Sequence, residues 1–190
     1  FWLLLLITAV ASLSGISQLA FMIVLVRETI RDGLTSCFSR SSGEELLDLQ
    51  FIIATRSNSP MSLAFIDLDH FKQINDRFGH DAGDQALIAA TTAIRNDLRM
   101  GDMLVRWGGE EFLLIMPNTD APQACTALDR IRAIGFGRRP DDVPVTASIG
   151  IAERRSDHAE SWQKLVEVAD TRMYAAKGAG RDRIVGCDPP

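Results

Sequence analysis

The sequence has little of what disulfide-rich, fibrous or basic nucleic-acid-binding proteins need. Its 190 residues include 3 cysteines and 7 prolines, and 20 basic side chains stand against 25 acidic ones, a net charge of -5. Cys37, Cys125 and Cys187 have no paired spacing, so we expect neither a disulfide framework nor a zinc site. An acidic chain repels a phosphate backbone, which excludes long nucleic acid and leaves small phosphate ligands held by local cations or a metal.

Charged side chains are absent from residues 1–26, a mainly apolar run. As a helix this run is about 39 Å long, against a hydrocarbon core of roughly 30 Å. We therefore expect a transmembrane helix over residues 1–26 and a second domain over residues 27–190. Arg27 and Arg31 follow the run, and the positive-inside rule places that domain in the cytoplasm. The run lacks the positive n-region of a signal peptide, and a first residue other than Met predicts further chain upstream.

The rest of the chain predicts an α+β domain. A short apolar run over residues 62–68 is typical of a buried strand, as are the runs over 145–152 and 183–186. Apolar residues at helical spacing predict helices over 81–100, 121–134 and 161–177. Two apolar runs flank Gly108 and Gly109, a pattern typical of a hairpin whose primed turn needs positive φ. This order resembles the ferredoxin-like arrangement of helices on an antiparallel or mixed sheet.

Two aspartates end the first predicted strand. Alternation places Asp67 and Asp69 on one face and Ile66 and Leu68 on the other. A carboxylate beside an apolar core is costly unless it is hydrogen-bonded or bound to a cation. In one interpretation Asp67 pairs with a cationic side chain and Asp69 caps the next helix.

The second interpretation is a metal site. Glu110 and Glu111 add two like charges at the hairpin, and such a cluster is tolerated mainly beside a divalent cation. Together with Asp67 they indicate a magnesium site. Because Mg²⁺ usually takes one or two carboxylates plus substrate phosphates, the chemistry indicated is phosphoryl or nucleotidyl transfer. Exposed acids on a tight turn are the alternative.

Two motifs carry a family resemblance. RWGGEEF over residues 106–112 and FIDLDHFKQINDRFGHDAGD over residues 65–84 resemble the GGDEF-domain diguanylate cyclases. Three further motifs also stand in the order of the family. They are DGLT at 32–35, SIG at 148–150 and YAAKGAGRDRI at 174–184. The resemblance implies a nucleotidyl-cyclase-like fold related to ferredoxin-like and polymerase-palm sandwiches, with a central, mainly antiparallel five-stranded sheet and surrounding helices.

The resemblance also implies an activity. Two GTP-loaded domains would face each other in a homodimer and form cyclic di-GMP with loss of pyrophosphate. With the N-terminal helix, it implies an enzyme anchored in the bacterial inner membrane.

The resemblance assigns the metal and the reacting groups. Asp67 and Glu110 would hold Mg²⁺ or Mn²⁺ through their side chains, and Leu68 through its carbonyl. Glu111 would be a proton acceptor or lie just behind the metal ligands. Lys72 would stabilise charge in the transition state.

It also assigns the contacts to the nucleotide. Asn75 and Asp84 would pair with the guanine base, and His80 would make a further nucleotide contact. Lys177 and Arg181 would hold the triphosphate. The alternative is that Lys177 and Arg181 are solvent-exposed residues at the C-terminal end of the predicted helix, where cations are favoured without any ligand.

A further motif resembles a product-inhibition site. Arg99 and Asp102 form the RxxD pattern of many of these cyclases, and Arg130 would be a distant partner. Arginine suits a cyclic dinucleotide because it binds phosphate through two bonds and stacks on guanine.

Three positions depart from the family pattern. Ser36 and Ser39 replace the usual glycine and asparagine, which affects the start of the domain more than the site. Asp182 replaces an asparagine, and its charge near the triphosphate predicts weaker GTP affinity.

The leading hypothesis is an active cyclase. The alternative is a catalytically idle GGDEF domain that binds GTP or cyclic di-GMP, but idle versions usually lose the hairpin acids that this chain keeps. A purine cyclase using ATP would leave Asn75 and Asp84 without a role.

Overall fold

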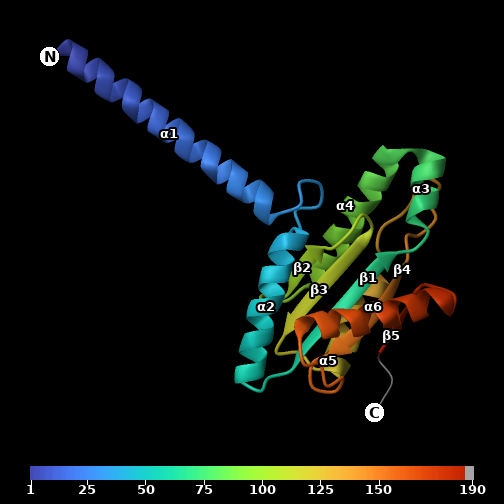
Figure 1. Cartoon of the computed structure of the whole chain (residues 1–190). Coiled ribbons are helices and arrows are strands. Elements are labelled where there is room, and N and C mark those ends of the chain that lie inside the picture. Colours follow the sequence, from blue (N-terminus) through green and yellow to red (C-terminus); the bar gives the residue numbers. More distant parts are fainter. Residues whose placement is uncertain (187–190) are drawn as a thin grey trace.

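The computed structural model describes residues 1–186, with the side chains of residues 4–5, 9–10 and 20–29 outside the description. A mixed five-stranded sheet lies at the centre, with helices on both faces (Figure 1). The elements in chain order are α1 (Trp2–Ile30), α2 (Arg40–Arg56), β1 (Met61–Leu68), α3 (Phe71–Phe78), α4 (His80–Asp97), β2 (Met103–Arg106), β3 (Glu111–Pro117), α5 (Ala121–Ile134), β4 (Ala147–Glu153), α6 (Trp162–Gly178) and β5 (Arg183–Val185).

The strands lie in the order β2-β3-β1-β4-β5, so β1 is the central strand. β1 pairs antiparallel with β3 and with β4, and β2 pairs antiparallel with β3. β4 and β5 are parallel, because α6 carries the chain back along the sheet between them. The sheet is therefore mixed, which corrects the expectation of a mainly antiparallel sheet.

The predicted helices and strands of the domain are confirmed, with ends that differ by a few residues. The prediction missed α2 (Arg40–Arg56), which begins after Ser39, whose side chain accepts a hydrogen bond from the N–H of Ser42. The buried side of α2 includes Gly43, Leu47 and Ala54. Gly43 and Ala54 are small, so the sequence of α2 shows only a weak periodic pattern of large apolar residues.

The hairpin differs from the predicted two-glycine turn. Residues 107–110 connect β2 to β3, and neither Gly108 nor Gly109 has a positive φ. A Cβ at Gly108 would overlap Oε2 of Glu111, which is the end of a flexible side chain and could move away. The primed turn was therefore the wrong turn type.

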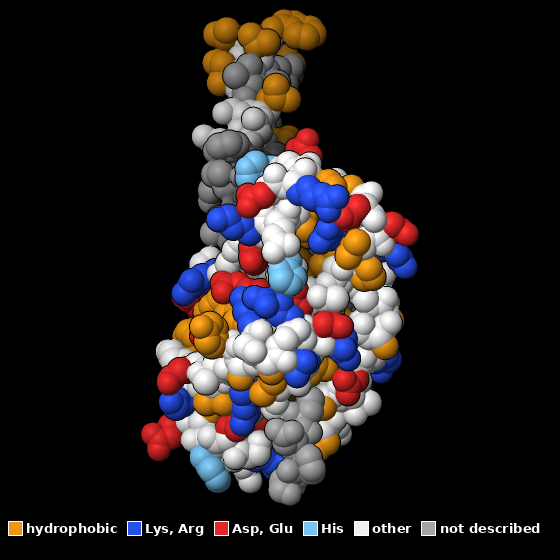
Figure 2. All heavy atoms as spheres, turned by 90° about the vertical axis from the view of Figure 1, so that its right-hand side faces the viewer, with side chains coloured by type: hydrophobic (Ala, Val, Ile, Leu, Met, Phe, Trp, Pro, Cys, Tyr) orange, Lys and Arg blue, Asp and Glu red, His pale blue; other side chains and the backbone are white. Residues whose placement is uncertain are grey.

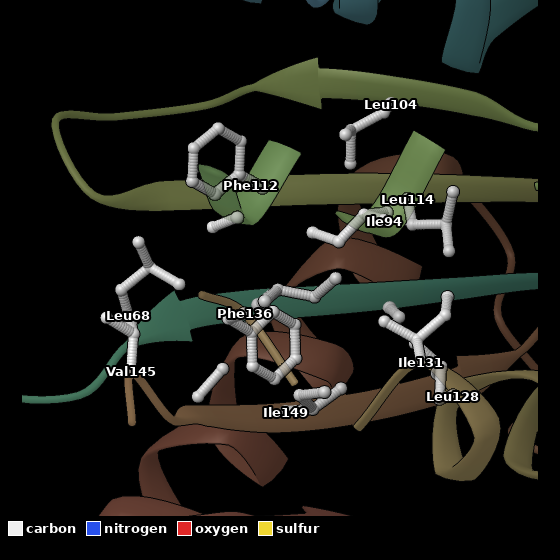
Figure 3. Packing of buried hydrophobic residues seen from close by; sticks show 14 of the residues in the cluster. Leu68, Ile94, Leu104, Phe112, Leu114, Leu128, Ile131, Phe136, Val145 and Ile149 are labelled. Atoms are coloured by element: carbon white, nitrogen blue, oxygen red, sulfur yellow. The ribbon is translucent and has the colours of Figure 1, made fainter. Parts of the chain in front are cut away.

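The two sheet faces hold different cores. Leu68 and Phe112 from the sheet pack with residues of α4, α5 and their loops, among them Ile94, Leu128 and Phe136 (Figure 3). On the other face, Leu63 and Phe65 pack with residues of α2 and α6, including Leu47 and Leu165. Since side chains alternate along a strand, Asp67 follows Leu63 and Phe65 towards α6.

α6 lies directly on the β4 backbone. A Cβ at Gly150 would overlap the carbonyl oxygen of Ala169 and the backbone nitrogen of Met173. The glycine of the SIG motif thus allows the close approach that brings the end of α6 to the end of β1.

α1 (Trp2–Ile30) extends away from the rest of the molecule (Figure 1). Among the residues covered by the description, no helix has the length and hydropathy required to cross a membrane. The transmembrane helix expected over residues 1–26 is therefore not found there. In the described stretch of residues 11–19, three serines and a glutamine interrupt the apolar side chains.

The cysteines differ from one another. Cys37 is buried with a free thiol, whereas Cys125 is disulfide-bonded. One disulfide-bonded cysteine does not make a disulfide framework, so that expectation is not contradicted. Cys187 lies outside the described residues.

Candidate functional site

A pocket of about 370 Å³ lies where β1, the β2–β3 hairpin, α3 and the end of α6 meet. Figure 2 views the molecule from the side to which that end of α6 points, and shows Lys and Arg side chains beside Asp and Glu side chains in the middle of this face. Five predicted site residues line the pocket. They are Asp67, Lys72, Glu110, Lys177 and Arg181.

Asp67 is the buried carboxylate of this pocket. It is 3% exposed, and its Oδ2 lies 2.7 Å from the Nζ of Lys177 on α6. Burial raises the pKa of Asp67 above its ordinary value, and the neighbouring Asp69 raises it too, although Lys177 opposes both effects. The interpretation that Asp67 pairs with a cation is therefore confirmed.

Glu110 lies in the hairpin loop next to Asp67. Its backbone carbonyl accepts a hydrogen bond from the N–H of Leu68 at 3.2 Å, which joins the loop to the end of β1. Burial raises the pKa of Glu110, and the negative charge of Asp67 raises it further. The two carboxylates thus repel each other, so a cation between them would be favoured.

The hairpin loop is also held from its other side. Arg106 donates from Nη2 to the carbonyl of Gly109 at 2.8 Å and from Nη1 to Asp32 at 3.0 and 3.1 Å. Asp32 in turn accepts the backbone N–H of Thr35 at 2.8 Å. Through these bonds the DGLT segment supports the loop that carries Glu110.

The donor set fits a magnesium-type ion. The described residues contain no group of three or more His, Cys, Asp or Glu side chains close enough to hold a metal by themselves. Two carboxylates, Asp67 and Glu110, are nevertheless the protein ligands that Mg²⁺ commonly takes when substrate phosphates complete its coordination. The two cations, Lys177 and Arg181, suit those phosphates.

Glu111 lies apart from this pocket. It lines a neighbouring pocket of about 360 Å³ with Arg40, Trp107 and Asp170. Burial raises the pKa of Glu111, followed by the negative charge of Asp67. The assignment of Glu111 as a proton acceptor stays a prediction.

Asp69 does not cap α3, so that prediction is wrong. The residue before α3 is His70, at a φ of 59°, and it makes no side-chain cap. Asp69 instead accepts hydrogen bonds from Thr146, Ser148 and the backbone of Asp182. Lys72, on the first turn of α3, is exposed.

Asp182 does not add an uncompensated charge to the pocket. Its Oδ1 lies 2.9 Å from the Nε of Arg132 on α5. This partly exposed ion pair opposes the effect of the Asp182 charge, and the weaker GTP affinity stays a prediction.

The predicted guanine-reading residues lie at the corner between α3 and α4. Asn75 is half-buried in α3, and a Cβ at Gly83 of α4 would overlap its Oδ1. Asp84 follows Gly83 and is exposed, as is His80 at the start of α4. These residues do not line the pocket of Asp67. A single ligand would have to span both regions to contact them and Asp67 together.

The predicted product-inhibition residues lie in another pocket, of about 300 Å³. Arg99 and Asp102 line it, and the backbone N–H of Arg99 donates to the Asp102 carboxylate at 3.0 Å. Arg130 does not line it; its Nε lies 2.6 Å from Asp97 Oδ2.

The sequence interpretation missed several residues of these pockets. Arg31 and Arg95 join Arg99 in the third pocket, and Arg95 could have been found because it lies one helical turn before Arg99. No sequence signal pairs Asp69 with Thr146 or Asp182, which are far from it in the chain.

Comparisons with known proteins point to one family. A sequence model of the family described as "Diguanylate cyclase, GGDEF domain" matches residues 29–183. A probable diguanylate cyclase of Escherichia coli (strain K12), DgcC, is 40% identical over 158 residues, which cover 80% of this chain and 42% of that protein. Diguanylate cyclase DgcP of Pseudomonas aeruginosa is 35% identical over 162 residues, 83% of this chain and 24% of that protein. The chain spans less than half of either relative.

A solved structure shares the fold. The coiled coil and GGDEF domain of DgcB from Caulobacter crescentus, in complex with c-di-GMP, matches with a TM-score of 0.82 and 31% identity. The match covers 93% of this chain and 95% of that one, which confirms the fold that the motifs implied.

Proposed function

Because this chain belongs to the GGDEF family of diguanylate cyclase domains, we propose that it condenses two GTP molecules into cyclic di-GMP and two pyrophosphates. The observation that carries the proposal is the pocket at the end of β1. There two carboxylates, Asp67 and Glu110, lie beside two cations, Lys177 and Arg181.

Each group has a chemical task in this reaction. Lys177 and Arg181 bind the triphosphate, and Asp67 and Glu110, with the carbonyl of Leu68, hold Mg²⁺ or Mn²⁺. When bound there, the ion would supply positive charge that neutralises the reacting phosphate. Lys72 lies at the pocket wall and stabilises the charge that develops on the phosphate oxygens.

Base recognition falls to the α3–α4 corner. Asn75 offers an amide and Asp84 a carboxylate, which together complement the N–H groups and ring nitrogen of guanine but not the edge of adenine. His80 adds a contact to the nucleotide. This pairing favours GTP over ATP as substrate.

The reaction needs two copies of the domain. In each half-reaction the 3′-hydroxyl of one GTP attacks the α-phosphorus of the other, a P–O bond to pyrophosphate breaks, and the hydroxyl proton passes to a base, for which Glu111 is the candidate. Each domain holds one GTP and presents it to the other, so we propose a homodimer as the active form.

The third pocket supports regulation by the product. Arg99, with Arg31 and Arg95, offers the bidentate donors that suit the phosphates of cyclic di-GMP, and Asp102 can accept from guanine. The related DgcB domain is described in complex with c-di-GMP. The same pocket is also compatible with a second function, an idle domain that only binds cyclic di-GMP.

Attachment to the bacterial inner membrane, with this domain in the cytoplasm, stays a prediction from the uncharged run alone.

The test is an assay of the full chain with GTP or ATP and Mg²⁺, over a wide dilution series. We expect cyclic di-GMP from GTP only, at a rate that rises more steeply than linearly with enzyme concentration. Glu110→Gln should lower the rate at least about 100-fold because the site loses a metal-binding charge, whereas Glu45→Gln, an exposed change on α2, should not. A folded Glu110→Gln protein with normal activity would overturn the metal assignment, and wild type that binds but never converts GTP would favour the idle domain.

A further inference from the structure

Asp69 is a buried carboxylate that the roles above leave unused. It is 5% exposed, and its Oδ1 accepts the hydroxyl of Ser148 at 2.7 Å. Its Oδ2 accepts the hydroxyl of Thr146 at 2.8 Å and the backbone N–H of Asp182 at 3.0 Å. A carboxylate out of water is stable only when such bonds replace its hydration, so this group must stay in one geometry with all three donors.

The Asp182 bond restrains the loop between α6 and β5. Arg181 and Asp182 have φ values of 64° and 43°, a left-handed conformation that is unfavourable for residues other than glycine. Such a conformation persists only where surrounding contacts determine it.

The two peptide groups that flank the Cα of Arg181 are both anchored. The N–H of Arg181 donates to the carbonyl of Ala176 at 3.0 Å, and the next N–H, that of Asp182, donates to Asp69. Since both peptide planes are fixed, the direction in which the Arg181 side chain leaves the backbone is fixed too.

Residues at the C-terminal end of β1 therefore hold both cations of the pocket, Lys177 and Arg181, in place. Asp67 holds Lys177 through its ion pair, and two residues later Asp69 holds the loop beyond Lys177. We propose that Asp69 is a positioning residue that directs Arg181 towards the triphosphate of GTP. The inference rests on the proposed function, because it takes Arg181 as a triphosphate-binding residue.

The first experiment measures affinity in the full chain with Mg²⁺ and 3′-deoxy-GTP, which lacks the attacking hydroxyl, and in parallel with GMP. Asp69→Asn keeps the shape but removes the charge and turns one acceptor into a donor. It should weaken 3′-deoxy-GTP binding about tenfold and leave GMP binding unchanged, because GMP lacks the β- and γ-phosphates. Thr146→Val, a milder change, should give a smaller loss of the same kind. Asp129→Asn, an exposed change on α5, is the matched control.

The second experiment separates positioning from a general structural role. Asp69→Asn is combined with Arg181→Ala, and the two single variants complete the cycle. If Asp69 acts through Arg181, Asp69→Asn should cost less than about twofold in affinity once Arg181 is gone. Equal losses in both backgrounds would overturn the proposal, as would an equal loss for GMP.

The third experiment needs no nucleotide. Amide hydrogen exchange over residues 178–185 should be faster in Asp69→Asn than in wild type and unchanged in Asp129→Asn. If Asp69→Asn does not fold, Thr146→Val takes its place in all three measurements. Unchanged exchange would overturn the role of Asp69 even in a fully active enzyme, whereas wild type that binds no 3′-deoxy-GTP would overturn the proposed function instead. A change in Mn²⁺ affinity without nucleotide would mark Asp69 as a metal ligand and also overturn the proposal.

Discussion

The ammonium group of Lys177 lies 2.7 Å from Oδ2 of Asp67, so a cation of α6 neutralises the buried carboxylate at the end of β1. In the proposed function this ion pair joins the part of the site that would hold a metal to the part that would hold phosphate. A metal bound by Asp67 would share that carboxylate with Lys177, and a bound triphosphate would offer Lys177 another anionic partner.

Lys177→Ala should lower both stability and GTP affinity. Asp67 would keep its burial but lose its cation, so we expect a loss of about 1–2 kcal/mol in the free energy of unfolding at neutral pH, since Lys177 is itself partly exposed. Without the competing ammonium, Mn²⁺ should bind more tightly in the absence of nucleotide. Thermal unfolding and calorimetric titration measure both effects. Lys164→Ala, on the exposed side of α6, is the control, and an equal loss of stability there would contradict the ion-pair argument.

Gly83→Ala should weaken GTP binding with little effect on the fold. The added Cβ would overlap Oδ1 of Asn75, which is the end of a flexible side chain and can move away, and would lie 3.1 Å from Cζ of the buried Phe71, which must shift slightly. Alanine is favoured over glycine within a helix by about 1 kcal/mol, which offsets the cost of that shift. We therefore expect a melting temperature close to that of wild type, about tenfold weaker GTP binding and less selectivity against ATP.

The matched control for that change is Gly15→Ala in α1, where an added Cβ meets nothing within 4 Å. Nucleotide binding should be unaffected there. If Gly83→Ala binds GTP as well as wild type does, Asn75 does not recognise the base.

Asp32→Asn should reduce stability in a pH-dependent way. Burial raises the pKa of Asp32, but hydrogen bonds from Thr35 and the guanidinium of Arg106 outweigh it and leave the pKa below the ordinary value of 3.8. A carboxylate with a lowered pKa stabilises the fold above that ordinary value, and the contribution is lost as the pH falls through the lower pKa of the folded state.

Urea unfolding at several pH values measures this effect. We expect Asp32→Asn to lose about 1 kcal/mol at pH 7, with the difference from wild type shrinking below pH 3.8. Asp48→Asn, at an exposed position of α2, should cost little at either pH. A deficit that does not change with pH would mean that the charge of Asp32 is unimportant.

Arg99→Ala should relieve inhibition by the product. Arg99 lines the pocket of Arg31 and Arg95, and its loss removes bidentate contacts to phosphate. The quantity to measure is the ratio of rates with and without added cyclic di-GMP, and we expect the inhibiting concentration to rise at least about tenfold. Arg130→Ala should change it less, because Arg130 is bound to Asp97 outside the pocket. Inhibition that is overcome simply by more GTP would contradict a separate site.

The sequence alone determined the order of elements and the types of residue at the site. Periodicity is a local property, so the apolar run that became β1 and the stripes that became α4, α5 and α6 could be read directly. The carboxylates Asp67 and Glu110 could be singled out because acids beside apolar strands need an explanation.

Only the tertiary structure decided which groups meet. Lys177 lies 110 positions after Asp67 in the chain, and the two pair because the missing side chain of Gly150 lets α6 lie on β4. Asp69 was expected to cap a helix. Its carboxylate instead accepts hydrogen bonds from Thr146, from Ser148 on β4 and from the backbone N–H of Asp182 in the α6–β5 loop. Asp182 was expected to weaken the phosphate site, and Arg132 on α5 opposes the effect of its charge. Electrostatic and hydrogen-bond partners depend on distance in space, and spacing along the sequence does not encode that distance for residues on different elements.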